Sequence, residues 1–145
     1  MALAQWCRAK NLAGNPVITA TRLTDDAPLP GDARAALALG AQEPVSFRHV
    51  RLVCGDLVLS DARNWYLPAR LPPEMNRALA DTEQPFGSVI APLHFTRERI
   101  DSLHGAGPGC PAQTILTNRA VIRKPDGEAL ALVVECYQPA LLGGK

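Results

Sequence analysis

Apolar and polar positions alternate along two pairs of segments, as they do in β-hairpins. Residues 45–54 (VSFRHVRLVC) are followed by a Gly-Asp turn and by LVLSDARNWYLP, which predicts a first hairpin. TILTNRAVIRK, a Pro-Asp-Gly turn and EALALVVECYQPALL predict a second hairpin. A further strand is predicted in PVITATRL, which starts at the Asn15-Pro16 pair. Residues 1–15 predict one or two helical turns before it.

Between these strands, the spacing of apolar residues changes to that of helices. LPPEMNRALAD begins with a proline pair and places Met75 and Leu79 on one face, which predicts a helix. ARAALAL follows Asp32, a residue suited to cap a helix, and stops at Gly40. QPFGSVIA fits a helix or a strand, and HFTRERIDSLH fits a helix or an extended edge. Hairpins separated by helices indicate a single α+β domain over residues 1–145, in which helices pack on part of an antiparallel sheet.

Composition narrows the class of protein. With 145 residues, a hydrophobic content of 47% and a net charge of +1, the chain is expected to form one globular core. The near-zero charge argues against nucleic acid or an anionic membrane as the partner. No apolar run of about 18 residues occurs, so no membrane span is expected. Since the first residues also contain no secretory apolar region, the predicted location is the cytoplasm, and the oligomeric state is left open.

The residues that commonly bind metals show no spacing typical of a metal site. The four cysteines form no C-x-x-C pair, and two of them, Cys54 and Cys136, lie in apolar strand-like runs where free buried thiols are expected. The three histidines have no metal-ligand spacing with one another or with the cysteines. HGAGPGCP, residues 104–111, lacks the G-x-G-x-x-G spacing and predicts a flap or a plain loop. We therefore predict neither a metal nor an organic cofactor.

Two charged residues stand among residues that are expected to be buried. Glu135 lies in VVECY, where both alternating sets of side chains are apolar, which predicts a central strand covered on both faces. Arg48 shares a face of its strand with Val50 and Leu52, and a buried guanidinium needs an anion because it does not lose its proton. That anion is either Glu135 or the carboxylate of a ligand. Glu135 itself is either a structural ion-pair or edge residue, or a ligand contact inside a cavity.

The order of these motifs resembles that of chorismate lyase (chorismate pyruvate-lyase), which makes 4-hydroxybenzoate for ubiquinone. The resemblance rests on T-x-x-R at 19–22, FRHVRLVCGD, LSDARNWYLPARL, QPFG and ALVVECYQPALL, in one register over nearly the whole chain. The same fold is used by the effector-binding domains of certain bacterial repressors. The resemblance implies a six-stranded antiparallel sheet with helices on one side and an internal, largely enclosed ligand cavity.

The resemblance also implies roles for particular residues. Arg48 in FRHV would bind the ring carboxylate, assisted by a backbone N–H of Phe86 or Gly87 in QPFG. Glu135 in VVECY would meet the 4-oxygen end of the ring. The implied activity is that of a carbon–oxygen lyase that eliminates pyruvate from chorismate, with Arg48 and Glu135 as catalytic residues and no cofactor.

Departures from the family pattern favour an alternative function. Only residues 1–15 precede the first predicted strand, whereas the enzyme has a longer helical region that helps close the cavity. HGAGPGCP stands where a covering flap is expected, and NWYLPARL is more aromatic than the corresponding strand. The alternative is a non-catalytic module of the same fold that binds an aromatic or cyclohexadiene carboxylate.

Overall fold

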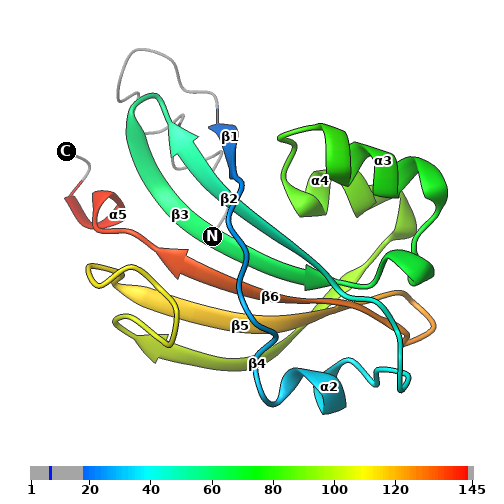
Figure 1. The fold of residues 1–145 in the computed structure, drawn as a ribbon. Helices are drawn as coiled ribbons and strands as arrows, with labels where there is room; N and C mark the ends of the chain where they lie inside the picture. Colours follow the sequence, from blue (N-terminus) through cyan, green and yellow to red (C-terminus); the bar gives the residue numbers. More distant parts are fainter. Residues whose placement is uncertain (1–6, 8–17, 144–145) are drawn as a thin grey trace.

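The computed structural model describes Cys7 and residues 18–143, which form a six-stranded antiparallel sheet with short helices (Figure 1). The order across the sheet is β1-β2-β3-β6-β5-β4. The predicted α+β architecture with a single antiparallel sheet is therefore confirmed. The strands are β1 (Ile18–Leu23), β2 (Ser46–Cys54), β3 (Leu57–Tyr66), β4 (Thr96–His104), β5 (Leu116–Arg123) and β6 (Ala129–Tyr137).

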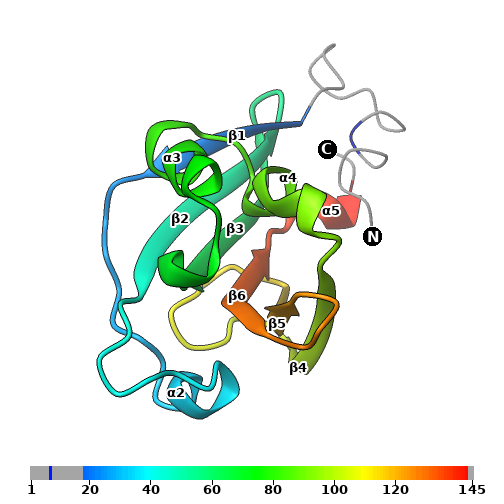
Figure 2. The same cartoon turned by 90° about the vertical axis from the view of Figure 1, so that its right-hand side faces the viewer.

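The larger helices share one face of the sheet. α3 (Pro73–Asp81) and α4 (Phe86–Ile90) pack on the side of Ala120 and Val133, here called the helix-covered face (Figure 2). α2 (Ala33–Ala36) packs on the side of Trp65 and Val134, here called the opposite face. The expectation of helices on one side of the sheet is correct for α3 and α4. The four-residue helix α2 covers a small part of the other side. Short 3-10 turns at Pro68–Arg70 and Ala91–Leu93 flank α3 and α4, and α5 (Ala140–Gly143) follows β6.

Alternation along β6 supplies residues to the two larger hydrophobic clusters, one on each face of the sheet. Ala131 and Val133 pack beneath α3 and α4, whereas Leu132 and Val134 pack towards α2. All four side chains are buried, and burial of each valine or leucine contributes about 1.5–3 kcal/mol. The predicted central strand with two covered faces is confirmed, because β6 lies between β3 and β5.

The structure shows the conformation of the two segments that the sequence left open. QPFGSVIA contains α4, and HFTRERIDSLH contains β4, an edge strand that is exposed along its whole length. α3 forms as predicted, with Met75 and Leu79 buried. α2 is shorter than ARAALAL, and Asp32 at its N-cap makes no side-chain capping bond, since its carboxylate binds Arg119 instead. The predicted helical turns in residues 1–15 lie outside the described residues apart from Cys7.

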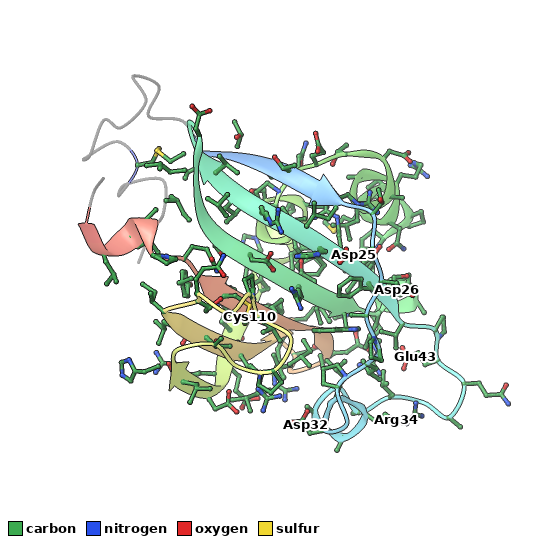
Figure 3. The ribbon with its side chains drawn as sticks, turned by 60° about the vertical axis from the view of Figure 1, so that its left-hand side comes forward. Asp25, Asp26, Asp32, Arg34, Glu43 and Cys110 are labelled. Atoms are coloured by element: carbon green, nitrogen blue, oxygen red, sulfur yellow. A yellow bond between two sulfur atoms is a disulfide. The ribbon has the colours of Figure 1, made fainter. Side chains whose placement is uncertain are left out.

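All four cysteines are paired, so the expectation of free thiols is wrong. Cys7 bonds to Cys54, and Cys110 in the glycine-rich loop bonds to Cys136 on the opposite face (Figure 3). Of the two forms predicted for HGAGPGCP, a flap over the predicted cavity is wrong and a plain loop is right, because residues 105–111 form a loop that lies across the sheet from α3 and α4. Disulfides are typical of oxidising compartments, so the cytoplasmic location stays a prediction. No helix among the described residues is long and apolar enough to cross a membrane.

A cluster of charged side chains surrounds the buried Asp61 and His49 on the opposite face. Asp61, which is 1% exposed, accepts hydrogen bonds from His49 Nε2 at 2.8 Å and from Arg51 Nε and Arg63 Nε, each at 3.2 Å. His49 Nδ1 lies 2.9 Å from an oxygen of Asp25, in the segment that joins β1 to α2. Burial alone would lower the pKa of His49, but its hydrogen bonds to the two carboxylates outweigh burial and raise the pKa. The His49 imidazole thus ties this segment to the sheet.

We predict that His49 stabilises the fold in a pH-dependent manner. Because the pKa of His49 is raised by folding, its contribution is complete below the unfolded pKa of about 6.5 and is lost as the pH rises through the folded pKa. The free energy of unfolding, measured in urea for the natural chain and for His49→Gln, should therefore differ less as the pH increases. A difference that stays constant or grows with pH would contradict this account.

A second prediction concerns the Cys110–Cys136 disulfide. Since this bond closes a loop between residues 26 positions apart, its loss through Cys110→Ser should reduce the free energy of unfolding by about 2–4 kcal/mol. Urea unfolding without reductant measures the loss. Alkylation followed by mass spectrometry serves as the control and should detect no reactive thiol in the natural chain before reduction. Equal stability of the two proteins would show that the bond does not hold the loop.

Candidate functional site

Arg48 projects from β2 beneath the C-terminal end of α3 and is only 1% exposed. Its Nε donates to the carbonyl oxygen of Leu79 at 3.0 Å, and its Nη2 donates to that of Thr82 at 2.9 Å. The last carbonyl groups of a helix lack partners within the helix and carry partial negative charge. Arg48 therefore has one structural role that the sequence did not reveal, which is to cap α3.

The third nitrogen of the Arg48 guanidinium, Nη1, is buried and has no hydrogen-bond partner among the described residues. Burial lowers the pKa of Arg48 to about 10, and the positive charge of nearby Arg22 acts in the same direction. Arg48 nevertheless stays protonated at neutral pH. A buried N–H without a partner costs about 1–3 kcal/mol, and more when it is charged, so this atom is suited to bind an anion.

A cavity of about 80 Å³ lies between the helix-covered face and α4. Three of the four predicted site residues, Phe86, Gly87 and Glu135, line it. Asn64 also lines the cavity and lies directly opposite Arg48 in the pairing of β2 with β3. The structure thus brings Phe86, Gly87 and Glu135 together, while Arg48 does not line the cavity and is related to it through its strand partner Asn64. The rest of the lining is mostly apolar: Val50, Leu52, Ala62, Pro85, Phe95, Arg97, Ile122 and Val133.

Phe86 and Gly87 are the first two residues of α4, directly after Pro85. Backbone N–H groups in the first turn of a helix have no acceptor within that helix. Pro85 accounts for the sharp start of α4, because its ring fixes φ and its nitrogen carries no hydrogen. Phe86 and Gly87 thus line the cavity and have backbone N–H groups without an acceptor in α4, and the family resemblance implies that one of these groups assists in binding the carboxylate.

Glu135 forms an ion pair with Arg97 of β4, and its side chain is 17% exposed. The alternative of a direct pair between Arg48 and Glu135 is wrong, and the expected structural ion pair has Arg97 as its partner. A wider hollow of about 420 Å³ shares Arg97 and Glu135 with the cavity and is lined by polar residues, including Tyr137. Burial and the charge of Glu135 raise the pKa of Tyr137 to about 12, so its phenol stays neutral.

Two residues of the site, Asn64 and Arg97, were not predicted from the sequence. Asn64 could have been identified, because alternation along LVLSDARNWY places it on the same face as Ala62 and Tyr66. Arg97 carried no such signal, since its segment fitted a helix as well as an edge strand. Among the described residues, no three histidine, cysteine, aspartate or glutamate side chains form a group that could hold a metal ion.

The amino-acid sequence is similar to that of a bacterial protein. An uncharacterized protein, y4mC, of Sinorhizobium fredii is 35% identical over 157 aligned positions, which cover 94% of this chain. The chain spans 66% of the length of that relative. No protein-family profile matches the sequence.

Solved structures with similar folds include an effector domain and a ligand-binding domain. The effector domain of PhnF from Mycobacterium smegmatis has a TM-score of 0.62 and 14% identity, with 96% of this chain and 91% of that chain covered. The longer PhnF chain has a TM-score of 0.67 and 14% identity, with coverages of 96% and 64%. The ligand-binding domain of a candidate GntR-family transcriptional regulator from Bordetella bronchiseptica has a TM-score of 0.61 and 12% identity, with coverages of 85% and 83%. At these identities the similarity shows the fold alone: the chain has the chorismate lyase-like fold of these effector- and ligand-binding domains.

Proposed function

We propose that the chain is a binding module for a small molecule that carries a carboxylate, most simply an aromatic or cyclohexadiene acid. The observation that supports this function is the buried Nη1 of Arg48, which has no partner among the described residues and belongs to a residue directly opposite Asn64, a residue of the cavity wall. A ligand carboxylate at this atom would accept a charge-assisted hydrogen bond and would neutralise the buried charge. The apolar side chains of Val50, Phe86 and Ile122 would contact the ring of the ligand.

The size of the cavity implies that ligand binding is coupled to movement. A volume of about 80 Å³ is well below the 300–1,000 Å³ of ordinary small-molecule sites. A ring would therefore fit only if α4 moved outward or if the ligand extended into the neighbouring hollow past Arg97 and Glu135. Such coupling suits a domain that reports ligand binding through a change of shape, and the PhnF domain of the same fold is an effector domain.

A catalytic lyase is the second candidate. It is favoured by the position of Phe86, Gly87 and Glu135 around one cavity beside Arg48. Against it, chorismate is a dianion, whereas Arg97, the arginine that lines the cavity, is already paired with Glu135. Glu135 would also have to leave Arg97 before it could contact the 4-oxygen of the substrate. We therefore prefer the binding module.

The binding function predicts that Arg48→Met weakens binding of 4-hydroxybenzoate by about 30-fold or more, because a buried charged hydrogen bond is worth about 2–5 kcal/mol. Isothermal titration calorimetry measures the affinity, and 4-hydroxybenzyl alcohol is the uncharged reference ligand. Arg22→Met is the matched control, since Arg22 also donates to the end of α3, at the carbonyl of Ala80, but has no nitrogen that is buried without a partner among the described residues.

The control separates a local loss of the anion site from damage to α3. Arg22→Met should bind 4-hydroxybenzoate within about twofold of the natural chain, while urea unfolding establishes that both variants are folded. Arg48→Met removes two hydrogen bonds to the end of α3 together with a buried charge that has no anionic partner, so the variant is expected to fold with reduced stability. Equal affinities of the natural chain and Arg48→Met would refute the proposed site.

The two candidate functions differ in their products. The binding module should release no pyruvate when the natural chain is mixed with chorismate and pyruvate is followed with lactate dehydrogenase. Arg48→Met serves as the blank for contaminating activity. Pyruvate formation by the natural chain that Arg48→Met abolishes would establish the lyase in place of the binding module.

A further inference from the structure

A second and larger cavity lies on the opposite face of the sheet. Its volume is about 580 Å³, which falls within the range of ordinary small-molecule sites. It lies across the sheet from the cavity beside Arg48: Val134 lines the larger cavity, while its neighbours Val133 and Glu135 line the smaller one. None of the residues proposed to bind the carboxylate contributes to it.

The walls of this cavity are largely apolar and are held in place. Trp65, Leu103 and Val134 contribute the sheet side, and the glycine-rich loop contributes Gly107 and Pro108. The loop is fixed at both ends, because its backbone and side chains form specific bonds to the sheet. Gly107 N–H donates to Thr117 Oγ1 at 2.8 Å, and the Cys110–Cys136 disulfide fastens the next part of the loop.

The polar end of the cavity carries an excess of negative charge. Arg119 is placed between two carboxylates, with Nη2 at 2.7 Å from Asp101 Oδ2 and at 3.0 Å from Asp32 Oδ2. These two carboxylates and one guanidinium leave one net negative charge at the rim. Hydrogen bonds from Arg119 lower the pKa of both aspartates, so that this charge persists at neutral pH.

We propose that this cavity is a second binding site, for a small cationic molecule that has an aromatic or aliphatic ring and an amino group. The ring would contact Trp65, Val134 and the exposed side chain of Leu103, which is 49% exposed. The ammonium group would lie at Asp101 and Asp32, where attraction by the net negative charge distinguishes an amine from an acid. The fixed loop would present this site without rearrangement, in contrast to the small cavity on the helix-covered face.

The proposal is tested with three probes of similar shape: benzylamine, benzyl alcohol and benzoate. NMR of the isotope-labelled full chain follows the backbone amides of Leu103 and Val134, which report on this cavity, and that of Glu135, which reports on the other face. Benzylamine should shift the first two amides saturably and should bind at least about fivefold more tightly than benzyl alcohol. Benzoate should be weaker than both at these amides, and 0.5 M salt should reduce the preference.

Two variants of β4 separate the charge effect from a general change of the strand. Asp101→Asn should weaken benzylamine by about threefold to fivefold, a modest effect because Asp101 is half exposed, and should leave benzyl alcohol unchanged. Glu98→Gln is the matched control, since Glu98 also pairs with an arginine, Arg123, but does not line the cavity. This control should bind benzylamine as the natural chain does.

Three results would overturn the proposal. The first is the absence of a saturable shift at Leu103 and Val134 with any of the probes. The second is binding of benzoate at these amides as tight as that of benzylamine. The third is a dimer at the assay concentration that Leu103→Asp dissociates, as measured by sedimentation, because the cavity would then be covered by a second copy of the chain.

Discussion

The arrangement of the molecule depends on a constraint at β6, the strand that lies between β3 and β5 and must bury both of its faces. Because successive side chains point in opposite directions, one face of β6 packs beneath α3 and α4 while the other packs towards α2. Towards the end of β6, one face carries Glu135 and Tyr137 and the other carries the disulfide-bonded Cys136. The two cavities thus lie on opposite faces of β6. Val133 and Glu135 line the smaller cavity, and Val134 lines the larger one.

On the helix-covered face, Arg48 is a buried charged residue whose hydrogen bonds are incomplete. Two of its nitrogens cap α3, so the guanidinium is held in place, and the third is left without a partner. Capping explains why an arginine is tolerated in a buried position, but a cap alone would not require the unpaired Nη1. The same contacts couple any anion at Nη1 to the end of α3, and α3 leads directly to α4 at the cavity wall. An anionic ligand at Arg48 would therefore neutralise the charge of the guanidinium and would also affect the positions of α3 and α4.

The sequence was informative wherever local pattern determines structure. Alternation placed Arg48 with Val50 on one face of β2 and identified β6 as a strand with two covered faces, and the proline pair with Met75 and Leu79 defined α3. Pairings between distant segments were not predictable, because they depend on strand order. Cys110 meets Cys136, and Arg97 meets Glu135, only because β4, β5 and β6 are neighbours in the sheet. The short α4 was ambiguous for a different reason, since five residues contain too few turns to show a helical period.

The central claim is that Nη1 of Arg48 binds a ligand carboxylate, and NMR of the guanidinium groups tests it most directly. Arg48→Lys assigns the Arg48 signal in the ¹⁵N spectrum of the natural chain, and 4-hydroxybenzoate is then added to saturation. The account predicts that the Arg48 Nη–H signals move and exchange more slowly with water, while those of Arg22 stay in place. Saturable binding that leaves the Arg48 signals unchanged would contradict the account and would place the carboxylate elsewhere.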